Sequence, residues 1–294
     1  MKTLLFGSGG LLGRQLQTEL SQHGHDLTAL THAQADITDS DILGKLFQEK
    51  WDVVINSAAI CDFDACEADP IKTGRVNREA PLDLATRCHQ SGATFVQFSS
   101  DYVFRGEGDR LLTEEDATEP LSVYGAQKAD LERKIPSLCP NSLILRISWL
   151  FGQGGRTFMS LLPALLEKEK SLRLASGKHG RCLYAADAAY WVRLLVEQGQ
   201  TGLLNLVNHG NTSWEEFAEV SLALMKSQGR PTRCEQLEQV PYSELGPNWA
   251  KRPRYSCLDT NEVSKLHPPG PRHWREALAD FLATEKSFAA EGVL

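Results

Sequence analysis

The chain has 294 residues, 41% of them hydrophobic and 23% charged, with a formal net charge of −7. This is the composition of an ordinary globular protein without a basic tract, so neither nucleic acid nor an anionic membrane is an expected partner. The seven cysteines lack zinc-type pairing, and no apolar run could span a bilayer. We therefore expect a cytoplasmic protein with reduced thiols, no signal peptide, no membrane segment and no metal.

A glycine turn follows the first predicted strand. Residues 3–6 form a short apolar run, residues 14–23 an amphipathic segment, and Gly7, Gly10 and Gly13 lie between them. Strand, glycine turn and helix are the context that a dinucleotide fingerprint requires. The three glycines would in turn make the tight turn, let the backbone approach a pyrophosphate, and let the helix pack on the sheet.

The start of this helix is a candidate phosphate site. The amides of Gly10, Leu11 and Leu12 would face the phosphates at the positive end of the helix. The alternative is a glycine turn that binds nothing, but its place between strand and helix favours a cofactor.

The second predicted strand, residues 26–30, ends in Thr31 and His32 and carries no acid at its tip. An acid there would bind the ribose 2′-hydroxyl and repel a 2′-phosphate. Its absence permits NADP, with Arg14 as the one nearby cation. We expect NADPH in preference to NADH.

Asp36 and Ile37 precede a predicted helix over residues 40–50 and stand where adenine would lie. The alternative for Asp36 is that it serves only as a turn or cap residue.

The third predicted strand, residues 53–59, ends in small side chains. Ala58 and Ala59 would let a cofactor lie against the backbone at the edge where α/β sheets bind ligands. Three acids follow, which we expect in a solvated loop and helix start rather than a metal site: Asp62, Asp64 and Glu67.

The fourth predicted strand, residues 95–99, delivers Ser100 and Asp101 to the same edge. A helix over residues 122–135 follows. Ser100 supplies a small hydroxyl that could hold a substrate oxygen.

Tyr124 and Lys128 lie one turn apart on that helix and therefore share a face. A phenol beside an ammonium is a plausible proton donor near neutral pH, because the positive charge lowers the pKa of the phenol. The spacing alone is common on helices and gains meaning only beside a cofactor site.

Four strand–helix units before residue 150 predict an α/β fold, a Rossmann-type doubly wound parallel sheet. We expect an NAD(P)-binding domain over residues 1–149, with sheet-completing segments around 183–207. Residues 150–182 and 208–294 would form a smaller substrate-binding lobe. Further predicted elements are a helix over 70–90, strands at 143–147, 172–174 and 203–207, and helices over 157–168, 186–198, 213–228 and 274–285.

These motifs together resemble the extended short-chain dehydrogenase/reductase family. The glycine turn, the small residues that follow Asn56, and the trio Ser100, Tyr124 and Lys128 carry that resemblance. Within it, nearly the whole chain is similar to the dTDP-4-dehydrorhamnose reductase family. The segments that carry this similarity are 99–104 (SSDYVF), 122–125 (SVYG), 147–149 (ISW), 180–187 (GRCLYAAD) and 252–259 (RPRYSCLD).

The resemblance implies reduction of the C4 keto group of a nucleotide-activated, dTDP-linked 4-keto-6-deoxyhexose by NADPH or NADH. Tyr124 would protonate the forming alkoxide, Lys128 would hold the nicotinamide ribose and lower the phenol pKa, and Ser100 would bind the C4 oxygen. Asp101 and Trp149 would contact the sugar. The alternative for Trp149 is a core aromatic residue.

Four positions depart from the family pattern. Cys61 and Phe63 stand where Thr and Val are common, and Cys182 and Leu183 replace Pro and Thr. All four would lie near the cofactor or sugar, with Cys61 a substrate-binding candidate. The acids that hold a dimer-bridging magnesium in some members have no match here, so no metal is expected.

Three alternative functions share these motifs. A 4,6-dehydratase would carry an acid after Asp101, where this chain has Tyr102, and a 4-epimerase lacks the SSDYVF continuation. A non-catalytic regulatory subunit like that of methionine adenosyltransferase would bind a protein partner instead. The expected ligand is a nucleotide sugar, and a homodimer is one assembly that the sequence allows.

Overall fold

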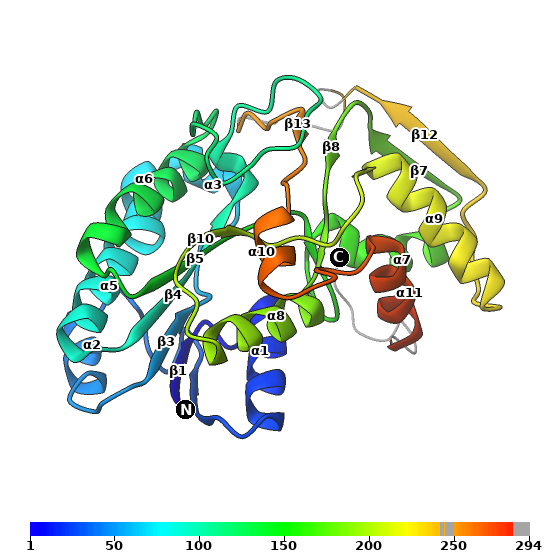
Figure 1. Ribbon diagram of the computed structural model, residues 1–294. Helices are drawn as coiled ribbons and strands as arrows, with labels where there is room; N and C mark the ends of the chain where they lie inside the picture. The colour runs from blue at the N-terminus through cyan, green and yellow to red at the C-terminus, as the bar shows by residue number, and fades with distance from the viewer. Residues whose placement is uncertain (242–243, 245–249, 285–294) are drawn as a thin grey trace.

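The computed structural model describes residues 1–241, 244 and 250–284, and its centre is a six-stranded sheet with helices on both faces (Figure 1). Every pairing in the sheet is parallel. The predicted doubly wound α/β fold is confirmed. In spatial order the strands are β10 (Gly202–Asn205), β5 (Ser142–Ile147), β4 (Thr94–Ser100), β3 (Val53–Asn56), β1 (Lys2–Phe6) and β2 (Asp26–Leu30).

Two apolar cores lie on the two faces of this sheet. Leu16 of α1 and Val192 of α8 are fully buried in one core, and Leu84 of α5 and Leu131 of α6 in the other. Alternate strand residues point to opposite faces, so each strand contributes to both cores. The helices are α1 (Leu11–Gln22), α2 (Ser40–Leu46), α3 (Phe63–Ala68), α4 (Pro70–Gly74), the π-helical η1 (Arg75–Glu79), α5 (Ala80–Ser91), the 3-10 turn η2 (Asp101–Val103), α6 (Val123–Leu138) and α8 (Ala185–Glu197).

A second, smaller group of elements packs around a third core that includes Phe151, Phe217, Trp274 and Phe281. It contains three small sheets, ordered β11-β8-β13, β12-β7 and β6-β9. None of the helices in the described part of the chain has the length and apolar character to cross a membrane. The elements are β6 (Leu150–Phe151), α7 (Phe158–Lys168), β7 (Ser171–Ala175), β8 (His179–Gly180), β9 (Leu183–Tyr184), β11 (Thr212–Ser213), α9 (Trp214–Ser227), β12 (Gln236–Val240), β13 (Tyr255–Ser256) and α11 (Trp274–Thr284). Helix α10 (Asn261–Leu266) packs against β10 instead, with Val263 buried in the first core.

The structure differs from the predicted elements in a few places. The strand expected over 53–59 ends at Asn56, and the helix expected over 70–90 is divided into α4, η1 and α5. Strand β12 and helix α10 were not predicted, because their short, mostly polar segments carry little periodic signal. The last residue of the helix expected over 274–285 lies outside the described residues.

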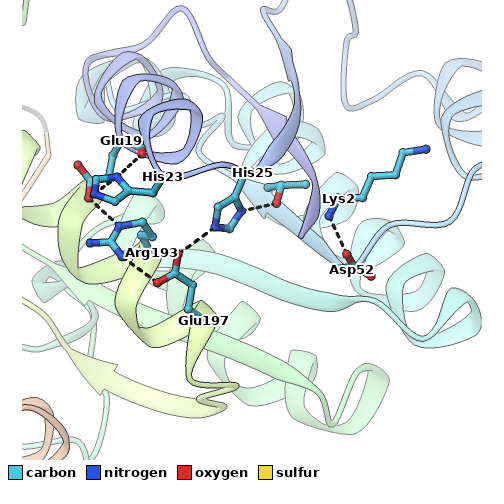
Figure 2. A network of polar contacts seen from close by, with 8 residues as sticks. Lys2, Glu19, His23, His25, Asp52, Arg193 and Glu197 are labelled. Carbon is cyan, nitrogen blue, oxygen red and sulfur yellow. Dashed lines mark hydrogen bonds and ion pairs between the residues drawn. The ribbon is translucent and has the colours of Figure 1, made fainter.

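A polar network fixes α1 against α8 at the start of the first two strands (Figure 2). The ring of His25 lies 2.9 Å from the Thr3 hydroxyl and 3.3 Å from a carboxylate oxygen of Glu197. Arg193 donates to Glu197 at 2.7 Å and to Glu19 at 2.8 Å. The network lies at the amino ends of the strands, so we assign these residues to the scaffold rather than to the ligand-binding edge.

Candidate active site

The glycine turn between β1 and α1 has the geometry that its sequence predicts. Gly7 has a φ of +77°, and a Cβ on it would lie 2.6 Å from the amide nitrogen of Ala58. A Cβ on Gly13 would overlap the carbonyl oxygen of Gly7. Gly10 has an extended backbone and begins the helix. Gly7 and Gly13 are therefore required by the packing itself, before any ligand is considered.

The first turn of α1 presents backbone donors. Gly10 caps the helix without a side-chain hydrogen bond, so the amides of Leu11, Leu12 and Gly13 have no acceptor within the helix. The amide of Gly10 was expected among the phosphate donors, but it donates to the Gly7 carbonyl at 3.0 Å and closes the turn. The remaining amides fit a pyrophosphate at the positive end of the helix.

The tip of β2 carries no acid in the folded protein either. Thr31 lies against Gly9, and its hydroxyl donates to Gln34 at 2.9 Å. Arg14, the expected cation for a 2′-phosphate, donates instead to the carbonyls of Gly9 at 2.5 Å and Gly154 at 2.9 Å. Its guanidinium joins the glycine turn to the loop after β6, so a role toward phosphate would compete with these bonds.

Asp36 adopts the turn role that was its alternative. Its carboxylate accepts hydrogen bonds from the amide and hydroxyl of Thr38, at 2.9 and 2.8 Å. The hydrogen bond from the amide holds the pKa of Asp36 below its ordinary value. Ile37 is buried beneath it in the sheet core. Contact of either residue with adenine stays a prediction.

The segment after β3 brings Ala58 and Ala59 to the carboxyl edge of the sheet. The side chain of Asn56 fixes this segment, because its oxygen accepts from the Ala58 amide at 3.1 Å while its nitrogen donates to Gln97 at 2.9 Å. The small side chains are half-buried and lie beside the glycine turn, since Gly7 contacts Ala58.

Asn77, in the π-helical η1, is a supporting residue that the sequence did not reveal. It is fully buried, donates to the carbonyl of Ile60 at 3.0 Å and accepts from the Ile60 amide at 2.8 Å. It also donates to Gln127 at 3.0 Å, which links the loop after β3 to α6. An asparagine inside a helical pattern gives no signal of such a role, whereas π-bulges often occur at functional sites.

Helix α6 carries the Tyr124 and Lys128 pair. Ser122 caps it by accepting from the Gly125 amide at 3.2 Å. A Cβ on Gly125 would overlap the carbonyl oxygen of Tyr102, so the helix start packs directly on η2. This contact brings Tyr124 beside the residues that follow β4.

Burial dominates the electrostatics of the pair. Only 7% of Tyr124 and 2% of Lys128 is exposed. The ammonium donates to the carbonyl of Phe98 at 3.0 Å and lies 5.6 Å from the centre of the phenol ring, while the phenol oxygen is 4.0 Å from the sulfur of Cys61.

The pKa of Tyr124 differs from the expectation that Lys128 lowers it. Burial, followed by the neighbouring Cys61, raises the pKa of Tyr124 well above its ordinary value, and burial lowers the pKa of Lys128. Desolvation disfavours the charged form of both groups, and the ammonium points at a carbonyl rather than at the phenol. These contacts of Lys128 therefore do not lower the pKa of Tyr124, contrary to what the sequence predicts.

Ser100 ends β4, Asp101 begins η2, and both are buried. The Ser100 hydroxyl donates to one Asp101 oxygen at 3.0 Å and accepts from the Tyr102 amide at 3.2 Å. Ser256, from β13, donates to the other Asp101 oxygen at 2.6 Å. The segment 252–259 carries part of the family resemblance, but its sequence indicates no role for Ser256.

Two of the four departures from the family pattern contact the site, and two do not. The ring of Phe63 stacks on Tyr102 with centroids 4.4 Å apart and meets Tyr124 edge-on at 5.0 Å, beside Cys61. Cys182 and Leu183 are fully buried in apolar cores. Their positions serve core packing, and the expectation that these two side chains lie near the cofactor or sugar stays a prediction.

A pocket opens beside Asp101, and Ser256 lines it. The pocket has aromatic walls and two cationic side chains. Burial, followed by the charge of Arg252, lowers the pKa of Lys178 to about 8. The lining residues are Tyr102, Trp149, Lys178, Trp214, Arg252, Pro253 and Ser256.

Trp149 has an unusual backbone, with a φ of +39°. Its half-buried indole fills the space over Gly180, where a Cβ would lie 2.7 Å from the ring, and meets Trp214 edge-on with centroids 6.2 Å apart. Positive φ is uncommon in a residue with a Cβ, and such conformations concentrate at functional sites. Trp149 thus lines the pocket as well as touching the third core.

The acidic side chains after Cys61 accept hydrogen bonds from backbone amides. Asp62 caps α3 by accepting from the Ala65 amide at 3.0 Å, and Glu67 accepts from the Val123 amide at 2.7 Å. Asp64 accepts from the Ala250 amide at 3.0 Å. Within the described ranges, no group of three or more His, Cys, Asp or Glu side chains is arranged to hold a metal ion.

Comparisons with known proteins give relatives over the full length of the chain. The model of the family described as "RmlD substrate binding domain" matches residues 1–287. Spore coat polysaccharide biosynthesis protein SpsK of Bacillus subtilis is 33% identical over 97% of this chain and 98% of its own. A dTDP-4-dehydrorhamnose reductase of Streptomyces griseus is 33% identical over 94% of this chain and 91% of its own.

Solved structures agree with these sequence relatives. The dTDP-4-dehydrorhamnose reductase of Bacillus anthracis, determined in complex with NADP, superposes with a TM-score of 0.89 at 26% identity. The match covers 97% of this chain and all of the other chain.

Proposed function

Since the chain belongs to the RmlD substrate binding domain family, we propose that it is an NAD(P)H-dependent reductase of the short-chain dehydrogenase/reductase type. Its substrate would be a nucleotide-activated, dTDP-linked 4-keto-6-deoxyhexose, reduced at C4 in the biosynthesis of a dTDP-rhamnose-type sugar. The names of several relatives and the NADP complex of one of them support this proposal. The observation that carries it is the burial of Ser100, Tyr124 and Lys128 around the end of β4, where Lys128 donates to the Phe98 carbonyl and Tyr124 packs on Tyr102.

The glycine turn and the first amides of α1 would hold the pyrophosphate of the nicotinamide cofactor, with Ala58 and Ala59 along its path. The cofactor, when bound, supplies the hydride. The absence of an acid at Thr31 and the NADP complex of a relative favour NADPH over NADH.

Tyr124 would donate its proton to the oxygen of the carbonyl under reduction. Burial raises its pKa, so the phenol carries its proton at neutral pH, and the transfer would also need a nearby positive charge to bring that pKa back toward neutral. Lys128 would contribute positive charge when its ammonium is released from the Phe98 carbonyl, and Ser100 would hold the substrate oxygen.

The side chains that line the pocket beside Asp101 suit a nucleotide sugar in their chemistry, although the pocket volume of about 10 Å³ would have to grow to admit one. Lys178 and Arg252 bring positive charge to one wall, which suits a diphosphate, and Trp149 and Trp214 offer apolar faces to the sugar and the base. Asp101 would accept a hydrogen bond from a sugar hydroxyl. Cys61, 4.0 Å from the phenol oxygen, would touch the reacting end of the sugar.

The decisive experiment follows nicotinamide absorbance with purified protein, a dTDP-4-keto-6-deoxy sugar, and NADPH or NADH in parallel. We expect oxidation with NADPH and a loss of roughly 10²-fold or more in kcat for Tyr124→Phe, because a positioned acid is removed. Tyr190→Phe is the matched control, since that ring is 41% exposed on α8. Undiminished turnover of Tyr124→Phe would refute the role of Tyr124. Absence of oxidation with tight NADPH binding would instead favour a cofactor-loaded binding protein.

A further inference from the structure

Ser256 reaches Asp101 from a distant part of the chain, 155 residues away in sequence. It lies in β13, which pairs with β8, and the neighbouring Tyr255 amide donates to the Gly106 carbonyl at 3.0 Å. The amide of Leu112 donates to the Cys257 carbonyl at 2.9 Å. The Ser256 hydroxyl is therefore held in place by backbone bonds on both sides, and only 2% of the residue is exposed.

The Asp101 carboxylate accepts two hydroxyl protons, one on each oxygen, from Ser256 and Ser100. An ionised carboxylate has about four acceptor sites, so each oxygen keeps a lone pair for another donor. The proton of Ser100 is directed at Asp101, while its oxygen accepts from the Tyr102 amide. The orientation of Ser100 thus depends on Asp101 remaining an acceptor.

We propose that Ser256 is a positioning residue of the reductase site, which holds Asp101 as an ionised acceptor and through it orients the hydroxyl of Ser100. This inference rests on the proposed function, because Ser100 and Asp101 are there the groups that meet the substrate. Ser256 itself lines the pocket but acts through the carboxylate.

The environment of Asp101 makes this support necessary. Burial raises its pKa to about 6, against the opposing effect of the side chains of Ser256, Ser148 and Ser100. The titratable groups around it are Tyr124 on α6 and Cys257 beside Ser256, and the cations of the adjoining pocket are Lys178 and Arg252. Removal of one donated hydrogen bond disfavours the ionised form of a buried carboxylate further.

The first test reads the carboxylate directly. The side-chain carboxyl carbon of Asp101 is followed by ¹³C NMR across pH in wild type, Ser256→Ala and Ser256→Thr, with Asp101→Asn to assign the signal. We expect the midpoint of the Asp101 titration to move up by about one pH unit in Ser256→Ala. It should return toward the wild-type value in Ser256→Thr, which keeps the hydroxyl. If Ser256→Ala does not fold, Ser256→Cys keeps the size and weakens the donor.

The second test uses the pH profile of kcat/KM. With the midpoint moved up by about one pH unit, Ser256→Ala should fall about fivefold below wild type at pH 6 and approach it above pH 8. Ser227→Ala, an exposed hydroxyl at the end of α9, should leave the profile unchanged. If Ser256 served packing alone, its substitution would lower the amount of folded enzyme without moving the acidic limb of the kcat/KM profile.

Identical titration midpoints and superimposable profiles in wild type and Ser256→Ala would overturn the proposal. The NMR measurement needs no turnover, so it still decides the role of Ser256 if the wild-type protein fails to reduce the sugar. Failure to reduce the sugar would then count against the proposed function and not against the role of Ser256.

Discussion

The pKa of a buried side chain in this protein depends more on burial than on a charged neighbour in the sequence. Tyr124 and Lys128 share a helix face, yet desolvation raises the pKa of the phenol and lowers that of the ammonium. Asp101 follows the same rule, since burial raises its pKa although two hydroxyls donate to it. At the residue scale the candidate site therefore keeps its acids protonated more firmly than free side chains would.

Asp101 should make the stability of the protein depend on pH. Its pKa is about 6 in the folded protein against an ordinary value of 3.8, so the folded state binds the proton more tightly. The resulting stabilisation is complete only below about pH 3, under the unfolded-state pKa, and is lost as pH rises through 6. The free energy of unfolding of wild type, relative to Asp101→Asn, should fall by about 2 kcal/mol between pH 4 and pH 7.

Urea denaturation of both proteins at several pH values measures this difference, and any constant cost of the substitution cancels. A difference that stays flat between pH 4 and pH 7 would mean that Asp101 titrates normally.

Helix α6 is the element that organises the candidate site. Successive turns of one face carry Tyr124, Lys128 and Glu132, and Glu132 makes a buried ion pair with Arg146 of β5 at 2.8 Å. Arg146 also donates to the carbonyl of Thr113, at 3.2 Å, and so ties the loop before α6 to the sheet. The pair fixes helix α6 on the sheet, because removing either partner would leave an uncompensated buried charge.

The start of α6 should tolerate no added side chain. In Gly125→Ala the new Cβ would overlap the Tyr102 carbonyl oxygen, so the helix and η2 must separate. We expect a destabilisation of about 1–3 kcal/mol, as for other overpacked sites, and a loss of reductase activity because Tyr124 moves from Asp101. Gly44→Ala on α2, where the nearest atom lies 4.0 Å away, is the matched control and should be neutral or slightly stabilising.

Urea denaturation and turnover of the two variants test this expectation. Equal stability and activity in both would show that the contact between α6 and η2 can relax freely.

The proposed substrate pocket depends on the molecule as a whole, because its walls come from distant segments. Tyr102 follows β4, Trp149 precedes β6, Lys178 precedes β8, and Ser256 comes from β13. The backbone of the segment after residue 250 holds Lys178, which donates to the carbonyls of Arg252 and Pro253 at 2.9 and 3.1 Å. The charge of the pocket therefore depends on the packing of the second group of elements against the sheet.

Binding of the nucleotide should weaken as pH rises through about 8. Lys178 loses its proton near that pH because burial lowers its pKa, and the proposed diphosphate site then loses one positive charge. The Kd for dTDP, measured by calorimetry at pH 7 and pH 9.5, should rise several-fold. In Lys178→Met the dependence on pH should disappear, whereas the exposed Lys170→Met should keep it.

A dependence on pH that persists in Lys178→Met would assign the titration to another group of the pocket.

The sequence by itself determined the doubly wound sheet, the place of the glycine turn, and the shared helix face of Tyr124 and Lys128. These features depend on contiguous residues, since the periods of strand and helix and the backbone freedom of Gly7 are local properties. The short strand β12 and the π-bulge at Asn77 escaped prediction because their local patterns are weak or look like plain helix.

Only the tertiary structure decided what surrounds each group. It buried Cys182 and Leu183 in apolar cores. It set the bond of Ser256 to Asp101 across 155 residues, and it turned the pKa of Tyr124 upward. Desolvation and long-range contacts depend on which segments pack together, and no local pattern of residues carries that information.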